Sequence, residues 1–272
     1  MFKRFLILAL ALLVLGFISP IALYLFYPSM SGLKEGVPEK TAFMKYREEQ
    51  WREKGKNIRM VRHWTPLAAI SPNLIRAVII AEDDKFWQHE GFDYDAIRKA
   101  LEKDIKKGKF KYGGSTISQQ LAKNLFLSPA KTPARKLKEA ILTWRLERNL
   151  SKKRLIELYL NVAEWGEGIF GVEAASRHYF GKNAHALTPR EAARLAAILP
   201  NPRRYSPLGD SRYVEARAEL IYQIMVKRNL VIPEFEELLG DSPRDLAPPT
   251  EPADQERDRR EEPRPKSGPT EP

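Results

Sequence analysis

The stretch from Gly113 to Asn124 has the residue types of an anion-binding turn. Its two adjacent glycines allow positive φ angles and a close approach of the backbone to a bulky anion. Thr116 and Gln119 have the spacing of a capping box, which predicts that a helix begins at Ile117. Free N–H groups and the positive dipole end of that helix would face the anion. The stretch therefore predicts either a phosphate site or an ordinary Gly-Gly turn. It is not a P-loop, because no Lys-Ser/Thr pair follows the glycines.

Glu82 is the candidate general base. It follows the apolar residues 77–81, so its carboxyl is expected at the edge of apolar packing, where burial raises its pKa and suits it to proton abstraction. The alternative is an exposed acid at a helix C-terminus, an unfavourable position for a carboxylate. Asp83 is a weaker candidate, because neighbouring helical residues face different ways. Phe86 is expected to pack in the core and His89 to be a structural hydrogen-bonder.

Glu139 is the second candidate carboxylate. Arg135 precedes it by four residues and Lys136 by three, so the three side chains can share one helix face. An arginine fork binds phosphate bidentately, and a lysine supplies a point charge. Lys123, one turn beyond Gln119, adds a further cation. The alternative reading of the Glu139 group is a surface ion pair of little energetic value.

Two other patterns have competing interpretations. Residues 128–131 fit the S-x-x-K pattern of penicillin-binding enzymes, but the companion Lys-Thr-Gly is absent, so no transpeptidase activity is expected. Lys131 is still expected to assist diphosphate binding, because it lies between the glycines and Arg135. The basic and aromatic residues 106–112 suit lipid headgroups or single-stranded nucleic acid, or form a merely solvated charge run.

The elements that must position these residues are mostly α-helices. Strand signals are almost absent and no repeat is visible. Ser71 and Pro72 have the types of an N-cap and a first helical residue, and Thr188 begins a second capping box. The predicted helices cover Ala42–Lys54, Pro72–Glu82, Asp95–Lys107 closed by Gly108, Pro133–Asn149, Ser151–Asn161, and a segment from Pro189 that ends before Pro200.

The composition limits the class of protein. No cysteine is present, which excludes a disulfide framework and a Cys nucleophile. The net charge is +11, but residues 241–272 hold six basic and nine acidic residues, so the rest carries +14. A body this basic suits nucleic acid, an anionic membrane surface or a phosphorylated substrate.

The N-terminal segment favours the membrane. From Phe5 to Tyr27 the sequence is uncharged and almost wholly apolar, long enough at 1.5 Å per residue for a hydrocarbon core of about 30 Å. This length exceeds the apolar region of a signal peptide, about 7–15 residues, and no clean cleavage site follows. The sequence predicts an uncleaved anchor, with a cleaved signal peptide as the alternative. Basic residues flank both sides and indicate orientation only weakly; we expect the body outside the cytoplasm, which disfavours nucleic acid.

Five regions follow from these patterns. The C-terminal region holds eight of the twenty prolines, many charges and few large apolar residues, so it is expected to be disordered. The expected regions are a cytoplasmic tail (1–4), a transmembrane anchor (5–27), a juxtamembrane segment (28–62), a catalytic domain (63–240) and a disordered tail (241–272).

Five motifs, in order, resemble the peptidoglycan glycosyltransferases, the lysozyme-like enzymes that polymerise lipid II. They occupy residues 82–91, 113–124, 135–139, 151–161 and 179–182. Residues 161–166 and 168–175 resemble the monofunctional biosynthetic transglycosylase subgroup. The resemblance runs from Trp64 to Pro207 and implies a lysozyme-like, mostly α domain.

The resemblance also implies roles for individual residues. Glu82 and Glu139 are implied to be catalytic, Glu82 as the base that deprotonates the acceptor 4-hydroxyl and Glu139 beside the diphosphate. Glu157, Tyr159 and Asn161 match a motif but are expected to serve packing and positioning. The implied substrate or diphosphate ligands are Gly113, Gly114, Ser115, Thr116, Gln119, Gln120, Lys123, Asn124, Lys131, Arg135 and Lys136. The implied site-shaping residues are Asp83, Phe86, His89 and Gly91.

The resemblance thus implies an inverting enzyme that makes β-1,4 glycan strands and releases undecaprenyl diphosphate in the periplasm, anchored in the bacterial inner membrane. Its expected partners are lipid II, the growing lipid-linked glycan and membrane lipids, with other cell-wall synthesis or division proteins as further candidates and no nucleic acid. No dedicated cofactor is expected, although Mg²⁺ or Mn²⁺ could assist the diphosphate. The open alternatives are a lytic transglycosylase or lysozyme-type enzyme, and a non-enzymatic scaffold that tethers wall polymer.

Overall fold

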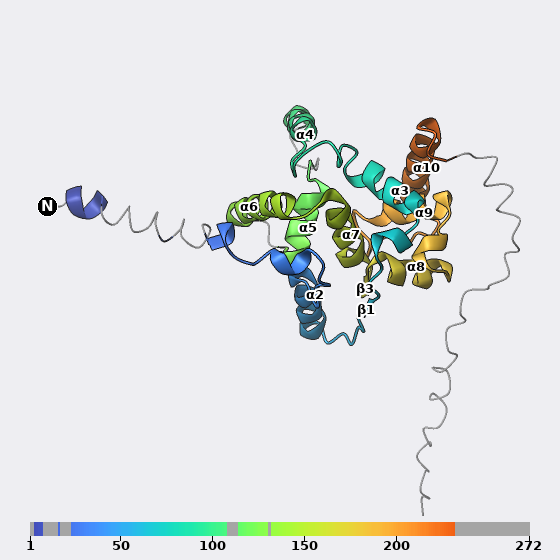
Figure 1. Cartoon of the computed structure of the whole chain (residues 1–272), viewed down its shortest axis with the longest axis horizontal. Helices are drawn as coiled ribbons and strands as arrows, with labels where there is room; N and C mark the ends of the chain where they lie inside the picture. Colours follow the sequence, from blue (N-terminus) through green and yellow to red (C-terminus); the bar gives the residue numbers. More distant parts are fainter. Residues whose placement is uncertain (1–2, 8–15, 17–22, 108–113, 130–131, 232–272) are drawn as a thin grey trace, which may run out of the picture.

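The computed structural model describes residues 3–7, 16, 23–107, 114–129 and 132–231. The described chain is mostly α-helical, as predicted (Figure 1). Its α-helices are α2 (Ala42–Glu53), α3 (Pro72–Glu82), α4 (Tyr94–Lys107), α5 (Ile117–Phe126), α6 (Pro133–Asn149), α7 (Lys152–Val162), α8 (Val172–Phe180), α9 (Pro189–Ile198) and α10 (Arg212–Lys227). Its 3₁₀ helices are η1 (Leu23–Leu25), η2 (Ser31–Leu33), η3 (Leu67–Ala69) and η4 (Ala184–Ala186).

Local capping explains where most of these helices begin. Thr116 and Thr188 both form the predicted capping boxes, in which the threonine oxygen accepts from the third helical N–H and the third side chain reaches back. Ser151 caps α7 by accepting from Arg154 N. Ser71 is the N-cap residue of α3 with Pro72 after it, as predicted, but its hydroxyl makes no capping hydrogen bond and donates to Leu187 O instead. Tertiary packing has redirected this side chain.

Two groups of helices form the core. In one group, α9 packs against α3 and α10; in the other, α5 packs against α2, α6 and α7. Phe86, Tyr159, Trp165 and Phe170 are among the largest buried side chains. The core position predicted for Phe86 is confirmed. The helices α8 and α10 are additional to the predicted ones, and α10 buries residues at helical spacing, from Val214 to Met225.

A small sheet is also present, so the expectation that strands are almost absent needs correction. The strands are β1 (Val61–Arg62), β2 (Glu164–Gly166) and β3 (Ile169–Phe170), in the order β1-β3-β2. β1 pairs with β3 in parallel, and β2 pairs with β3 antiparallel with an irregularity between Glu164 and Gly166. Strands of two or three residues have no readable alternation, and β2 and β3 are buried on both faces.

Parts of the terminal regions lie outside the described residues. Of the predicted span, residues 5–7, 16 and 23–27 are described, and the predicted tail from residue 241 lies wholly outside the described residues, which end at 231. Within the described ranges, no helix has both the length and the apolar character needed to cross a bilayer. Gly108, predicted to close α4, and residues 130–131 of the S-x-x-K pattern are also outside the description.

Candidate active site

Glu82 ends α3 with its carboxyl turned into the protein. Its side chain is only 11% exposed. Oε2 accepts a hydrogen bond of 2.7 Å from Gln120 Nε2 on α5, and Oε1 lies 3.7 Å from Arg217 Nη2 on α10. Burial raises the pKa of the Glu82 carboxyl, while Gln120, Arg217 and Lys123 oppose the shift. The predicted setting at the edge of apolar packing is confirmed, and the exposed alternative is wrong.

A second hydrogen bond fixes the amide that faces Glu82. Tyr159 Oη on α7 donates to Gln120 Oε1 at 3.1 Å, which turns the Nε2 end of the amide toward Glu82. Burial raises the pKa of Tyr159 well above its ordinary value, and the charges of Glu82 and Asp83 add to the effect. The phenol therefore stays protonated and remains a donor. Tyr159, predicted to serve packing and positioning, thus contacts the group that holds the candidate base.

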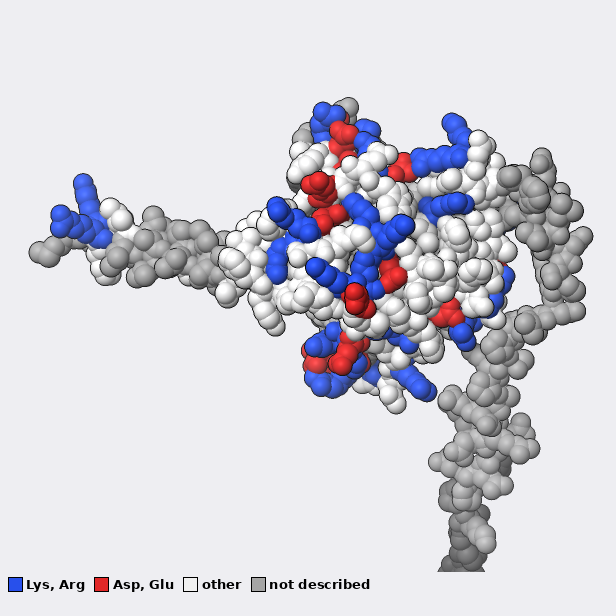
Figure 2. All heavy atoms as spheres, viewed as in Figure 1, with Lys and Arg blue, Asp and Glu red and all other residues white. Residues whose placement is uncertain are grey.

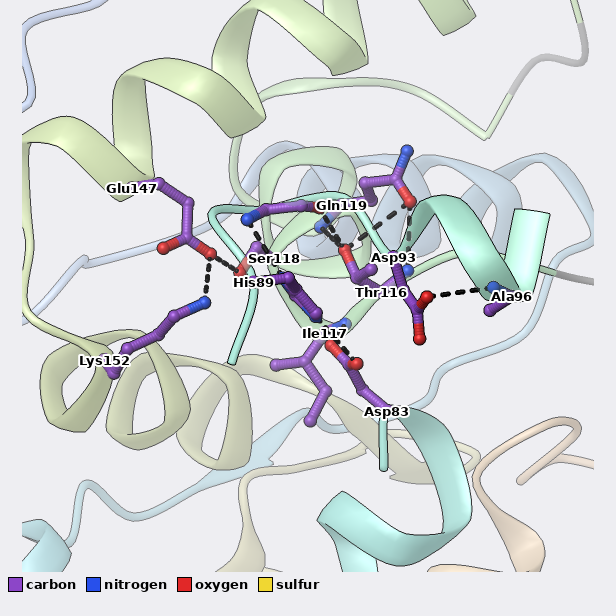
Figure 3. A network of polar contacts seen from close by, with 11 residues as sticks. Asp83, His89, Asp93, Ala96, Thr116, Ile117, Ser118, Gln119, Glu147 and Lys152 are labelled. Carbon is purple, nitrogen blue, oxygen red and sulfur yellow. Dashed lines mark hydrogen bonds and ion pairs between the residues drawn. The ribbon is translucent and has the colours of Figure 1, made fainter. Parts of the chain in front are cut away.

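Asp83 is directed away from Glu82 and holds the start of α5. Its Oδ2 accepts from Ile117 N, and its Oδ1 lies 2.9 Å from His89 Nε2 (Figure 3). Nδ1 of the same ring accepts from Gly91 N at 3.0 Å. Because Nδ1 is an acceptor, the ring proton lies on Nε2 and is donated to Asp83. The structural role expected for His89 is confirmed, and Asp83 acts with it to join the end of α3 to α5.

Gly91 is required at its position for two reasons. Its φ angle is +93°, a conformation that favours glycine, and an added Cβ would lie 2.9 Å from Thr143 Cγ2 on α6. Its carbonyl also accepts a hydrogen bond of 2.7 Å from Thr116 Oγ1. Gly91 therefore lets the loop after α3 pass closely between α5 and α6.

At the start of α5, where an anion cradle is predicted, two backbone N–H groups already have internal partners. Ile117 N donates to the Asp83 carboxylate, and Gln119 N donates to Thr116 Oγ1. The Gln119 side chain in turn accepts from Thr116 N, and both side chains are buried (Figure 3). An internal carboxylate thus already compensates the dipole end of α5. Thr116 and Gln119 shape the helix start, and these groups are already paired within the protein.

Gly114 has a packing reason of its own. A Cβ at this position would lie 3.0 Å from the Ile97 Cα of α4. The close approach that the glycine allows is therefore to a neighbouring helix. Gly113 and Lys131, predicted to bind diphosphate, lie outside the described residues.

The second carboxylate and its two cations meet on one face of α6, as predicted. Glu139 is 3% exposed, and its two oxygens accept from Arg135 Nη1 and Lys136 Nζ. Lys136 Nζ also lies 3.4 Å from Ser115 Oγ. Figure 2 shows basic side chains gathered over the middle of this face of the molecule, where α5, α6 and α7 lie in Figure 1, with acidic ones among them. Because Glu139 is buried and doubly paired, the surface ion-pair alternative is wrong.

Lys123 interacts electrostatically with both carboxylates. Burial lowers the pKa of its ammonium, and the nearby charges of Glu139 and Glu82 act against that shift. Arg135 and Lys136 lower it further, so the three cations crowd together. Such a group of partly desolvated cations favours a multiply charged anion.

A cavity of about 190 Å³ adjoins Lys123 and Gln120. Asn124 and Tyr159 also line it, as do Arg47, Glu164 and Arg203. Arg47 binds Glu164 through Nε at 3.0 Å and Nη2 at 2.7 Å. Asn124 is thereby placed beside the site residues, in a hollow lined by hydrogen-bonding groups. Among the described residues, no group of three His, Cys, Asp or Glu side chains could hold a metal ion.

Arg217 is the site neighbour that the sequence did not indicate. It lies on α10, beyond all five motifs, and its Nη2 also donates to Ala81 O at 3.1 Å. No local pattern marks it, because its partners are more than a hundred residues away in the chain. By contrast, Glu157 and Asn161 have the packing roles expected of them. Glu157 accepts from Leu67 N, and Asn161 exchanges two hydrogen bonds of 2.8 Å with the Thr65 backbone.

Comparison with known proteins gives one consistent family. The family model described as "Transglycosylase" matches residues 50–226, more than half of the chain. The "Biosynthetic peptidoglycan transglycosylase" of Nitrosospira multiformis is 51% identical over 193 residues, which cover 71% of this chain and 84% of that protein. Proteins of the same name from Methylobacillus flagellatus and Chromobacterium violaceum are 49% identical over 223 residues and 61% identical over 146 residues. These alignments cover 81% and 53% of this chain, and 94% and 64% of the respective relatives.

Proposed function

The chain belongs to the transglycosylase family, and we propose that it is a peptidoglycan glycosyltransferase that polymerises lipid II into β-1,4-linked glycan strands. The observation that carries this proposal is a pair of largely buried carboxylates: Glu82, held by Gln120 at 2.7 Å, and Glu139, whose oxygens accept from Arg135 and Lys136, with Lys123 lining the same cavity as Gln120. The arrangement provides a base on one side and a diphosphate site on the other.

Glu82 accepts a proton in the bond-forming step. The acceptor's 4-hydroxyl loses its proton to Glu82 as its oxygen attacks C1 of the donor sugar, and the bond from C1 to the diphosphate oxygen breaks. Attack from the face opposite the leaving group inverts C1. The raised pKa of Glu82 suits this role, because a base with a pKa nearer the working pH takes up a proton more readily.

The cations act on the leaving group. Negative charge grows on undecaprenyl diphosphate as the bond breaks, and Lys123, Arg135 and Lys136 stabilise that charge. Glu139 holds Arg135 and Lys136 in place and limits their mutual repulsion. Diphosphate leaves without a proton, so Glu139 does not need to be a general acid.

The pairing of Glu139 also bears on a divalent cation. Both of its oxygens are engaged by Arg135 and Lys136, so a cation that assists the reaction would be bound chiefly by the diphosphate itself. The steps proposed here use only the side chains of this chain.

The same observations disfavour the rival functions. A lytic transglycosylase or lysozyme-type enzyme also needs a catalytic glutamate, but it cuts an uncharged glycan and has no use for three crowded cations. A scaffold that tethers wall polymer has no use for a buried carboxylate held by Gln120 and Arg217.

The proposed location of the chain is inferred from its lipid-linked substrate. We place the lysozyme-like catalytic domain (63–240) in the periplasm, behind a single anchor in the bacterial inner membrane (5–27) and a short cytoplasmic tail (1–4). The lipid tails of donor and acceptor then remain in the bilayer while their sugars reach the site.

One assay separates the three functions. Purified full-length protein is incubated with radiolabelled lipid II in vesicles, and the products are separated by size with and without later muramidase digestion. We expect muramidase-sensitive polymer and released undecaprenyl diphosphate. Cleavage of preformed glycan without polymerisation would support the lytic enzyme, and polymer binding without turnover would support the scaffold.

A further inference from the structure

Three buried or half-buried arginines bind the backbone of residues 24–39, the stretch between the predicted anchor and α2. Arg145 on α6 is 8% exposed, and its guanidinium donates to Tyr24 O at 2.9 Å, Phe26 O at 3.0 Å and Pro28 O at 2.8 Å. Hydrogen bonds from a charged donor are about twice as strong as neutral ones. Arg145 therefore ties the carbonyls of three alternate residues of this stretch to α6.

The other two arginines continue the same pattern along the chain. Arg154 on α7 donates to Leu33 O and Gly36 O. Arg62 on β1 donates to Pro38 O and Glu39 O. Between these tied points, Met30 and Leu33 are buried in the core. Residues 24–39, here called the strap, are thus fixed to α6, α7 and β1 in turn.

Leu23, just before the strap, and the first residues of the strap present apolar side chains to their surroundings. Leu23, Phe26 and Tyr27 are 64%, 82% and 74% exposed, whereas Tyr24 is partly buried and has Lys138 Nζ 4.9 Å from its ring centre. Figure 1 shows this blue stretch passing α6 before the chain reaches α2. Exposed aromatic side chains directly after a long apolar segment are typical of a membrane interface. The residues before them, 5–22, still fall within the range of about 17–25 residues that crosses a hydrocarbon core.

The helix that holds the strap is also the helix that carries the donor-side cations. Arg135, Lys136 and Glu139 precede Arg145 on α6. At 1.5 Å per residue, they lie about 9–15 Å along the helix from Arg145. A straight helix is stiff over this length, so the point where the chain leaves the bilayer and the cation group move together.

We propose that Arg145 is a positioning residue that fixes the exit of the anchor on α6, so that the cation group stays at the level of the lipid headgroups. This inference rests on the proposed function for its substrate. The partner of the exposed residues 23–27 is the bilayer. The strap is then a rigid spacer and does not act as a loose tether, and it presents Lys123, Arg135 and Lys136 to a diphosphate that lies in the headgroup layer.

The first test measures geometry and needs no substrate. The chain has no cysteine, so the substitutions Phe26→Cys and Leu137→Cys introduce the only two sites that a thiol-reactive spin label can modify. Both positions are exposed, one on the strap and one on α6. In full-length protein in phosphatidylethanolamine–phosphatidylglycerol vesicles, we expect a narrow distance distribution between the labels. Adding Arg145→Ala should broaden it, whereas Arg148→Ala, an exposed arginine on the same helix, should leave it narrow. An unchanged narrow distribution with Arg145→Ala would overturn the proposal.

The second test compares two substrate forms. Arg145→Ala should lower turnover of lipid II in vesicles by about tenfold to a hundredfold, the size of effect that misplacement by an ångström can have. It should change turnover of a water-soluble short-chain analogue in detergent by less than about twofold, since that substrate needs no fixed height. Equal losses in both assays, with helical circular dichroism retained, would show that Arg145 supports the site itself and would overturn the proposed role. If wild-type protein polymerised neither substrate, the proposed function would fail while the distance measurement would still decide the role of the strap.

Discussion

At the scale of single residues, the largely buried Glu82 carboxylate contacts Gln120 and Arg217. These contacts determine the expected effect of replacing Glu82. Glu82→Gln keeps the shape and one hydrogen bond but removes the basicity. We expect turnover of lipid II to fall by about 10²–10⁴, the usual contribution of a general base, with substrate binding largely kept. Because the base works only when ionised and burial raises its pKa, the acidic limb of the pH–rate profile should lie above the ordinary range of a glutamate. It should vanish in the variant, and near wild-type turnover in a folded protein would rule out the proposed base.

The same substitution should change stability with a definite sign. The folded-state pKa of Glu82 is raised, so its contribution to stability is fully present below the unfolded pKa and is lost as pH rises through the folded pKa. Gln cannot ionise and keeps the favourable neutral form. We therefore expect Glu82→Gln to raise Tm relative to wild type at about pH 8 and to leave it nearly equal at about pH 4. A Tm difference that is independent of pH would contradict the raised pKa.

Tyr159 offers a subtler test of how the base is held. Tyr159→Phe removes the donor that orients the Gln120 amide, and loss of a neutral hydrogen bond of about 0.5–1.5 kcal/mol predicts a twofold to tenfold loss of turnover. The Gln120 hydrogen bond lowers the pKa of Glu82, so weakening it should move the acidic limb to higher pH. Tyr179→Phe is the matched control, because its hydroxyl donates to Trp165 O, away from the base. If both variants shift the limb alike, Tyr159 has no special part in positioning.

At the scale of elements, α5 and α6 together form the cation group, since Lys123 comes from one helix and Arg135 and Lys136 from the other. Lys123→Ala and Arg135→Ala should each lower turnover at sub-saturating lipid II by about tenfold to more than a hundredfold, from loss of about 1.5–3 kcal/mol of charge-assisted binding. Glu139→Gln should be impaired but retain more activity than Glu82→Gln, since Gln can partly hold the two cations. Lys153→Ala, an exposed cation on α7, is the control. Wild-type rates in both cation variants would contradict the proposal that the diphosphate binds at this site.

The loop after α3 has its own requirement for glycine. Gly91→Ala places a Cβ at positive φ and within 2.9 Å of Thr143 Cγ2, so we expect a loss of about 1–3 kcal/mol in the free energy of unfolding. Gly55→Ala also acts at positive φ, but no atom would lie within 4 Å of its Cβ, and it should cost less. Urea unfolding of both variants measures the difference. Equal losses would mean that backbone strain alone matters and that the close approach to α6 is unimportant.

At the scale of the whole molecule, the catalytic body and the tail from residue 241 differ in composition. The tail has too few large apolar residues to form a core. A chain that ends at Gly240 should therefore keep the turnover of lipid II of the full-length protein, measured in the same vesicles. A large loss of activity in a truncated protein with unchanged Tm would assign the tail a part in catalysis.

The sequence by itself determined the features that depend on neighbours in the chain. Thr116 and Thr188 lie three residues from their capping partners, and Arg135 and Lys136 lie within four residues of Glu139. Spacing over one helical turn brings these partners together once the helix forms, unless tertiary packing redirects a side chain, as it does at Ser71.

Only the tertiary structure decided which groups meet across the molecule. Asp83 binds Ile117 N across 34 residues and so occupies the helix end predicted to be free, while Tyr159 and Arg217 reach the surroundings of Glu82 from distant helices. The three arginines reach the strap in the same way. Such contacts depend on how helices pack and on which polar groups are buried together. A buried donor or acceptor must find a partner wherever the fold supplies one, and sequence spacing carries no information about that partner.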